Sequence, residues 1–154
     1  MYDVPFVATP EHVARRMLEM AQVGPDDVVY DLGAGDGRIL IMAAREFGAR
    51  AVGIELRKDL YNQIERKIKE YGLDGRVRVI YGSFYEVDVS EASVVTLYLL
   101  TSVNEKLRPK LERELKPGTR VVSHDFEVPG WRPVRVEEIY DSWTTHKIYM
   151  YRVK

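Results

Sequence analysis

The sequence predicts an α/β protein with a single doubly wound, mostly parallel sheet of seven strands that ends in an antiparallel hairpin. From residue 28 to residue 124, five short apolar runs alternate with segments whose apolar residues recur at three- and four-residue spacing, as strands alternate with helices. After residue 133, two segments alternate apolar and polar residues with a period of about two, which is typical of a hairpin. The length of 154 residues fits one domain spanning residues 1–154.

The N-terminal 24 residues predict a lead-in followed by a helix. Residues 2–9 are punctuated by proline and should be extended. Thr9 is a good N-cap, and Pro10 suits the first helical position. The apolar residues beyond it recur at helical spacing until Gly24, where the helix should already have ended.

The chain is organised around the strand, turn and helix that follow. Residues 28–32 are an apolar run bounded by turn residues, which predicts a buried strand. Three alternating glycines, Gly33, Gly35 and Gly37, interrupt it, and the next helix should stop at Gly48. Such a unit brings backbone N–H groups and the positive end of a helix to one point. The turn therefore predicts a binding site for an anionic or polar ligand.

The later elements follow the same two periodicities. The run at 92–100 is almost continuously apolar, as in a central strand that is buried on both faces. Apolar runs predict further strands at 51–56, 77–81 and 120–124, helical spacing predicts helices at 58–71 and 103–115, and alternation predicts hairpin strands at 134–140 and 146–153.

Composition excludes several classes of function. There is no cysteine, which rules out disulfides, thiolate metal sites and cysteine nucleophiles. A net charge of −1 gives no bulk reason to expect nucleic acid as a partner, although a local basic patch can hide in a neutral total. We expect no membrane span and no secretory signal, and therefore a cytoplasmic protein. Only two Asn and two Gln occur, which favours a thermophile.

The histidines do not suggest a metal centre. His12, His124 and His146 are scattered along the chain, and no two of them have the spacing of ligands on one helix. We therefore expect no metal site.

The glycine turn distinguishes between nucleotide-binding families. A dinucleotide fingerprint needs its third glycine where this chain has Arg38, and a phosphate-binding P-loop needs a Lys-Ser or Lys-Thr ending that is absent. The pattern Asp31-x-Gly33-x-Gly35-x-Gly37 after an apolar strand instead resembles motif I of the class I, seven-strand methyltransferases that use S-adenosyl-L-methionine. The resemblance implies a Rossmann-like fold in which the glycines pass close to the methionine moiety and the acid receives its ammonium group.

Carried over to this chain, the resemblance implies a complete cofactor site covered by residues 1–24. Glu55 closes the second strand, where a carboxylate can accept hydrogen bonds from a ribose diol. The segment after the third strand should bracket the adenine, although the family often has an acid where this chain has Ser83. The implied cofactor-binding residues are Phe6, Val7, Thr9, Asp31, Gly33, Ala34, Gly35, Gly37, Glu55, Leu56, Gly82, Ser83 and Phe84.

Three further segments narrow the resemblance. Residues 4–10, 99–104 and 115–124 look like those of the archaeal protein-lysine methyltransferases of the seven-strand type, relatives of the non-SET histone and mitochondrial lysine methyltransferases. This implies a monomeric N-methyltransferase of broad specificity that acts on exposed lysines of other proteins.

The end of the fourth strand should hold the substrate. Tyr98, Leu99 and Thr101 are expected to contribute to an apolar channel, which would lower the pKa of a lysine ammonium. The Asn/Asp-Pro-Pro-Tyr/Phe motif of methyltransferases that act on base or glutamine nitrogens is absent there. An RNA or small-molecule methyltransferase, or a cofactor-binding module without activity, remains an alternative.

Overall fold

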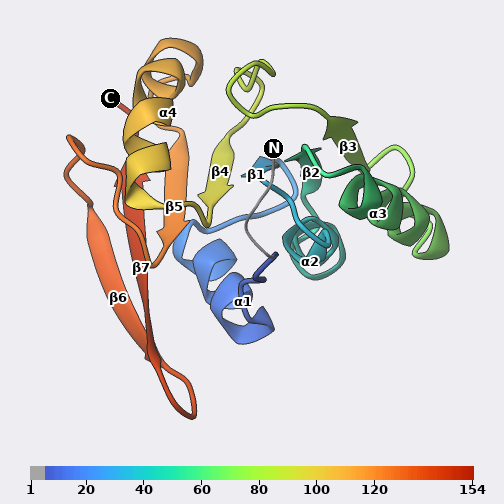
Figure 1. Ribbon diagram of the computed structural model, residues 1–154, viewed down its shortest axis with the longest axis horizontal. Coiled ribbons are helices and arrows are strands. Elements are labelled where there is room, and N and C mark those ends of the chain that lie inside the picture. The colour runs from blue at the N-terminus through green and yellow to red at the C-terminus, as the bar shows by residue number, and fades with distance from the viewer. Residues whose placement is uncertain (1–5) are drawn as a thin grey trace.

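The computed structural model describes residues 6–154 as one sheet flanked by helices (Figure 1). None of the helices in this range is long and apolar enough to cross a membrane. In chain order the elements are α1 (Glu11–Met20), β1 (Val28–Leu32), α2 (Arg38–Phe47), β2 (Arg50–Glu55), α3 (Lys58–Glu70), β3 (Val77–Tyr81), β4 (Val94–Leu97), α4 (Thr101–Glu114), β5 (Arg120–His124), β6 (Arg135–Tyr140) and β7 (Thr145–Arg152).

The sheet confirms the predicted class. Its strand order is β3-β2-β1-β4-β5-β7-β6, with β1 to β5 parallel and the terminal β6–β7 hairpin antiparallel. The chain first builds outward from β1 to β3 and then returns to place β4 on the other side of β1. This reversal of direction between β1 and β4 is the point at which open α/β sheets bind their ligands.

Two hydrophobic cores hold the sheet from its two faces. On one face, apolar side chains of α1, α2 and α3 pack on the strands, and on the other the leucines of α4 do so. Figure 1 shows α4 on the opposite side of the strands from α1 and α2. All five residues of β1 are buried, as expected for a central strand covered on both faces.

Two predicted boundaries are wrong. The strand predicted over 92–100 is only four residues long, because the chain leaves the sheet at Tyr98 and begins α4 at Thr101. The apolar residues beyond Leu97 make no ladder, and the first of them, Tyr98, lines the cleft described below. Thr9 is not the N-cap of α1; Pro10 takes that position without a side-chain hydrogen bond, and the Thr9 hydroxyl lies 3.0 Å from His124 Nδ1 instead.

Candidate functional site

A cleft of about 200 Å³ lies at the carboxyl ends of the central strands, next to the switch in strand order. Its walls come from the lead-in, the glycine turn, the end of β2 and the residue after β4. Of the residues predicted from the sequence, the cleft is lined by Phe6, Val7, Thr9, Asp31, Gly33, Ala34, Gly35, Glu55 and Tyr98. Sequence reasoning missed Ala8, Asp36, Arg38, Ile39, Arg57 and Leu60, which also line it.

The other predicted residues lie around the cleft without lining it. Leu99 and Phe84 flank the glycine turn, since a Cβ added to Gly33 would lie 3.5 Å from Leu99 Cδ2 and 3.7 Å from Phe84 Cε2. Gly37 has a φ of +83° and precedes α2, so its role in the fold is to start that helix. The remaining four follow strands or begin a helix: Leu56, Gly82, Ser83 and Thr101.

Four backbone N–H groups of the glycine turn are already occupied within the protein. The N–H groups of Gly33 and Ala34 both donate to the carbonyl of Ile54, at 2.9 and 3.0 Å. The N–H of Gly35 donates to Glu55 Oε1 at 2.7 Å, and that of Gly37 donates to the Ala34 carbonyl. The turn is thus pinned to β2 by its own amides. An anion-binding nest would need those amides to point outward.

Carboxylates give the cleft its chemical character. Asp31 is buried in the middle of the sheet, and its Oδ1 accepts a hydrogen bond of 2.9 Å from the hydroxyl of Thr96. The pair forms because Asp31 and Thr96 face each other in the register of β1 and β4. Burial raises the pKa of Asp31 to about 7, and the negative charge of Glu55 adds to this rise. The hydrogen bond from Thr96 acts in the opposite direction and lowers the pKa. A cationic ligand would stabilise the ionised form of such a buried carboxylate.

Glu55 joins the turn to the end of β2. Its Oε1 accepts the Gly35 N–H, and its Oε2 accepts the N–H of Arg57 at 2.9 Å. Only 7% of the residue is exposed. Each carboxylate oxygen can accept two hydrogen bonds, so each retains one acceptor position after holding the backbone.

The described part of the lead-in, residues 6–9, forms one wall of the cleft beside the glycine turn. The Phe6 ring lies so close to Gly35 that no side chain would fit there, and Gly35 also has a φ of +62°. The Thr9 carbonyl accepts a hydrogen bond of 3.1 Å from Arg38, whose guanidinium also pairs with Asp36. Residues 6–9 are therefore tied to the start of α2. The rest of the lead-in, residues 1–5, lies outside the described residues, and its role as a cover stays a prediction.

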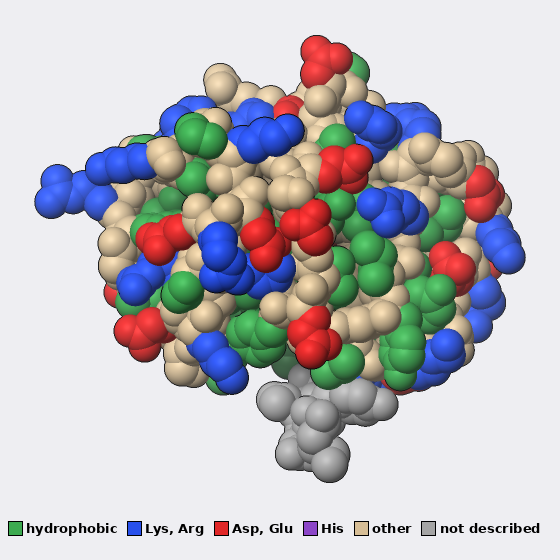
Figure 2. Space-filling view, turned by 90° about the horizontal axis from the view of Figure 1, so that it is seen from above, with side chains coloured by type: hydrophobic (Ala, Val, Ile, Leu, Met, Phe, Trp, Pro, Cys, Tyr) green, Lys and Arg blue, Asp and Glu red, His purple; other side chains and the backbone are tan. Residues whose placement is uncertain are grey.

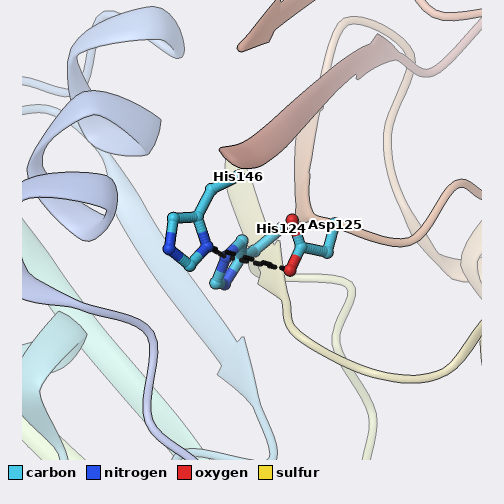
Figure 3. A group of neighbouring side chains, drawn as sticks. All are labelled: His124, Asp125 and His146. Atoms are coloured by element: carbon cyan, nitrogen blue, oxygen red, sulfur yellow. Dashed lines mark hydrogen bonds and ion pairs between the residues drawn. The ribbon is translucent and has the colours of Figure 1, made fainter. Parts of the chain in front are cut away.

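The fold also gathers two of the histidines that seemed scattered along the sequence (Figure 3). His124 ends β5 and His146 lies near the start of β7, and the antiparallel pairing of these strands places His124 Nε2 2.8 Å from His146 Nδ1. Asp125 Oδ2 lies 3.5 Å from His124 and 3.8 Å from His146. Spacing along one helix could not reveal this, because strand pairing brings together residues 22 positions apart. His124 closes a central strand, and that position was the available signal.

The histidine cluster borders the cleft. The ring of Tyr98, which lines the cleft, stacks on His124 with centroids 4.0 Å apart. Burial lowers the pKa of His124 to about 4, against the raising effect of the Asp125 charge. The imidazole is therefore neutral at physiological pH.

Comparison with known proteins identifies the family. Residues 31–135 match the model of the family described as the ANTKMT methyltransferase domain, which is more than half of the chain and includes the glycine turn, Glu55 and Tyr98. The chain belongs to this methyltransferase family. The matched region of the methyltransferase thus contains most of the residues that line the cleft, except those of the lead-in.

Relatives of the methyltransferase cover most of its length. A protein-lysine N-methyltransferase of Saccharolobus islandicus (strain REY15A) is 54% identical over 149 residues, which is 96% of this chain and 92% of the relative. The adenine nucleotide translocase lysine N-methyltransferase of mouse is 34% identical over 87% of this chain, which spans 58% of the mouse protein. A solved structure described as an RNA methyltransferase from Salinibacter ruber in complex with S-adenosyl-L-homocysteine matches with a TM-score of 0.89 and 50% identity, over 96% of this chain and 94% of that one.

Proposed function

We propose that this methyltransferase transfers methyl groups from S-adenosyl-L-methionine to the lysine side chains of proteins, as a monomer of broad specificity. The proposal rests on the 54% identity, over almost the whole of both chains, with a protein named for this activity. Members of the family from mouse and human are also named as lysine methyltransferases, for substrates as different as a nucleotide translocase and a subunit of ATP synthase.

The cleft fits the cofactor in charge and in hydrogen-bonding groups. S-adenosyl-L-methionine carries an α-ammonium group, and the buried carboxylate of Asp31 would hold it. Glu55 keeps one acceptor position on each oxygen and would receive the ribose hydroxyls. Phe84 lies beside Gly33 and would supply an aromatic wall for the adenine, with Gly82 and Ser83 next to it. The related structure with bound S-adenosyl-L-homocysteine supports the choice of cofactor.

The acceptor would enter beside Tyr98, at the end of β4. When bound, the cofactor supplies a sulfonium methyl group, which the lone pair of a neutral lysine amine attacks while the C–S bond breaks and its electron pair stays on sulfur. Tyr98, Leu99 and Thr101 would exclude water from this approach and so favour the uncharged amine by desolvation. The ammonium proton leaves to water before the attack. Orientation and desolvation then supply most of the rate enhancement.

RNA is the second candidate substrate, because the Salinibacter ruber structure at 50% identity is described as an RNA methyltransferase. RNA binding normally requires Lys and Arg side chains gathered along the path of the phosphates. On the face in Figure 2, Lys and Arg side chains are interspersed with Asp and Glu side chains, and the net charge of the chain is −1. This charge pattern favours protein over RNA.

One labelling experiment separates the candidates. The protein is incubated with methyl-labelled S-adenosyl-L-methionine and with either cell protein or cell RNA, and labelled lysines are identified by mass spectrometry. We expect label on many lysines, as mono- to trimethyl derivatives. Label in RNA alone would reject the lysine proposal in favour of the second candidate. Tight cofactor binding with no labelled acceptor would identify a binding module without activity.

A further inference from the structure

We propose that His124, Asp125 and His146 form a binding site for a divalent transition-metal ion of the zinc class, at the junction of β5 with the terminal hairpin. This inference concerns a site beside the cofactor cleft and does not depend on the methyl acceptor. It replaces the expectation, drawn from spacing along the chain, that the histidines hold no metal.

The three ligand atoms have the separations that one ion requires. Bonds of about 2.0–2.1 Å in tetrahedral geometry set ligand atoms about 3.3–3.4 Å apart. The pairs formed by His124 Nε2, His146 Nδ1 and Asp125 Oδ2 are 2.8, 3.5 and 3.8 Å apart, which brackets this value. All three atoms point toward one another in Figure 3. Two imidazoles and one carboxylate are also a ligand set that zinc takes in catalytic sites, with a fourth position open.

The outer nitrogen of His124 has the kind of partner that a metal-binding histidine usually has, and that of His146 does not. A histidine that binds a metal donates its other N–H to an oxygen, which fixes the tautomer. His124 Nδ1 lies 3.0 Å from the Thr9 hydroxyl. His146 Nε2 is buried without a hydrogen-bond partner among residues 6–154, and the nearest carboxylate oxygen, on Asp141, is 3.7 Å away.

The inner nitrogens would change roles when an ion binds. If a proton lies between the two histidines, one inner nitrogen donates and the other accepts. An ion would use the lone pairs of both inner nitrogens, so both outer nitrogens would carry protons. In either state a small movement of His146 would bring Nε2 to Asp141. The separations of the three ligand atoms therefore carry the proposal.

Asp125 is held so that one oxygen is directed at the histidines. Its backbone N–H donates to the Lys147 carbonyl at 2.7 Å, and its Oδ1 accepts the Lys147 N–H at 2.9 Å. Oδ2 is left to face both imidazoles. The residue has a φ of +64°, a conformation that is uncommon outside glycine. A carboxylate fixed in this way loses little side-chain freedom when it binds an ion.

The test measures metal binding to the tag-free protein without cofactor or substrate. The protein is treated with chelator and titrated with Zn²⁺ by calorimetry, and with Co²⁺ in the visible absorption spectrum. We expect one ion per chain and Co²⁺ bands of low coordination number. Asp125→Asn and His146→Gln should each weaken Zn²⁺ binding by about tenfold or more, since even loss of an outer-shell partner costs about 10–100-fold.

His12→Gln is the matched control. The His12 ring lies 6.3 Å from that of His146, and it is an exposed imidazole outside the ligand set. We expect its Zn²⁺ affinity to equal that of the parent protein. Melting temperatures in chelator would show whether Asp125→Asn, whose side chain is partly exposed, stays folded. The proposal is overturned if the parent protein binds no stoichiometric ion, if Asp125→Asn binds as tightly as the parent, or if His12→Gln loses as much affinity as His146→Gln.

Discussion

Replacement of Asp31 by asparagine isolates the electrostatic part of cofactor binding. The pKa of Asp31 is about 7 in the free protein, because burial outweighs the hydrogen bond from Thr96. Only the ionised carboxylate attracts an ammonium group, so at pH 6 about nine in ten molecules must first lose a proton. At pH 8 about nine in ten are already ionised. The affinity should therefore rise about tenfold from pH 6 to pH 8, equivalent to about 1.4 kcal/mol.

Asparagine keeps the shape of the side chain and can still accept the Thr96 hydroxyl, but it does not titrate. The assay is calorimetry with S-adenosyl-L-homocysteine, whose ammonium group titrates identically against both proteins. The ratio of the two affinities, parent over Asp31→Asn, should carry the tenfold rise. If the two affinities change in parallel between pH 6 and pH 8, Asp31 is not the ammonium partner and the reasoning fails.

The stability of the free protein provides a second measurement of the same group. The folded-state pKa of Asp31, about 7, is above its unfolded value near 3.8, so between these pH values the native state holds a proton that the unfolded chain has lost. The contribution of Asp31 to the free energy of unfolding therefore falls as pH rises through this window, by as much as about 4 kcal/mol, while the lowered pKa of His124 acts in the opposite direction. The measured quantity is the difference between Asp31→Asn and the parent in urea denaturation, which should grow in favour of Asp31→Asn from pH 4 to pH 8.

Three other substitutions test the packing around the site. Gly53→Ala places a Cβ 2.5 Å from Leu40 Cδ1 and should destabilise the fold by about 1–3 kcal/mol in urea denaturation; an unchanged midpoint would mean that α2 moves freely on the sheet. Glu55→Ala removes the acceptor of the Gly35 N–H in the glycine turn and that of the Arg57 N–H, and should weaken S-adenosyl-L-homocysteine binding by about tenfold or more in calorimetry; an unchanged affinity would contradict the ribose assignment. Tyr151→Phe leaves the buried N–H of Val128 without its 2.9 Å acceptor and should lower the free energy of unfolding by about 1–3 kcal/mol, whereas a neutral effect would show that water replaces the hydroxyl.

Local sequence patterns were sufficient to predict the elements whose burial follows a regular pattern along their length. β1 is buried at every residue, and the β6–β7 hairpin alternates, so both periodicities are visible in the chain itself. The end of β4 was mispredicted because apolar residues continue past Leu97 after the sheet has ended, with Tyr98 lining the cleft and Leu100 exposed. Hydrophobicity alone does not distinguish a strand residue from a residue in such a connection.

The two carboxylates of the site could be predicted from their positions at the ends of apolar strands. Asp31 and Glu55 lie at the carboxyl ends of neighbouring strands and both line the cleft. The state of the turn amides could not be predicted, since it depends on the register that places Ile54 and Glu55 opposite the turn. The two carboxylates were predicted from the sequence, whereas the hydrogen bonds that tie the turn to β2 depend on the pairing of β1 with β2.

Thr9 connects the two sites mechanically. Its carbonyl is held by Arg38 at the glycine turn, and its hydroxyl contacts His124 at the end of β5. The two contacts lie on opposite sides of one residue, so the lead-in can leave the cofactor cleft only by breaking the hydrogen bond to the histidine cluster. An ion on His124 would fix the N–H on Nδ1 and so commit the Thr9 hydroxyl to accept it. The residue that was predicted to cap a helix instead joins the histidine cluster to the cofactor cleft.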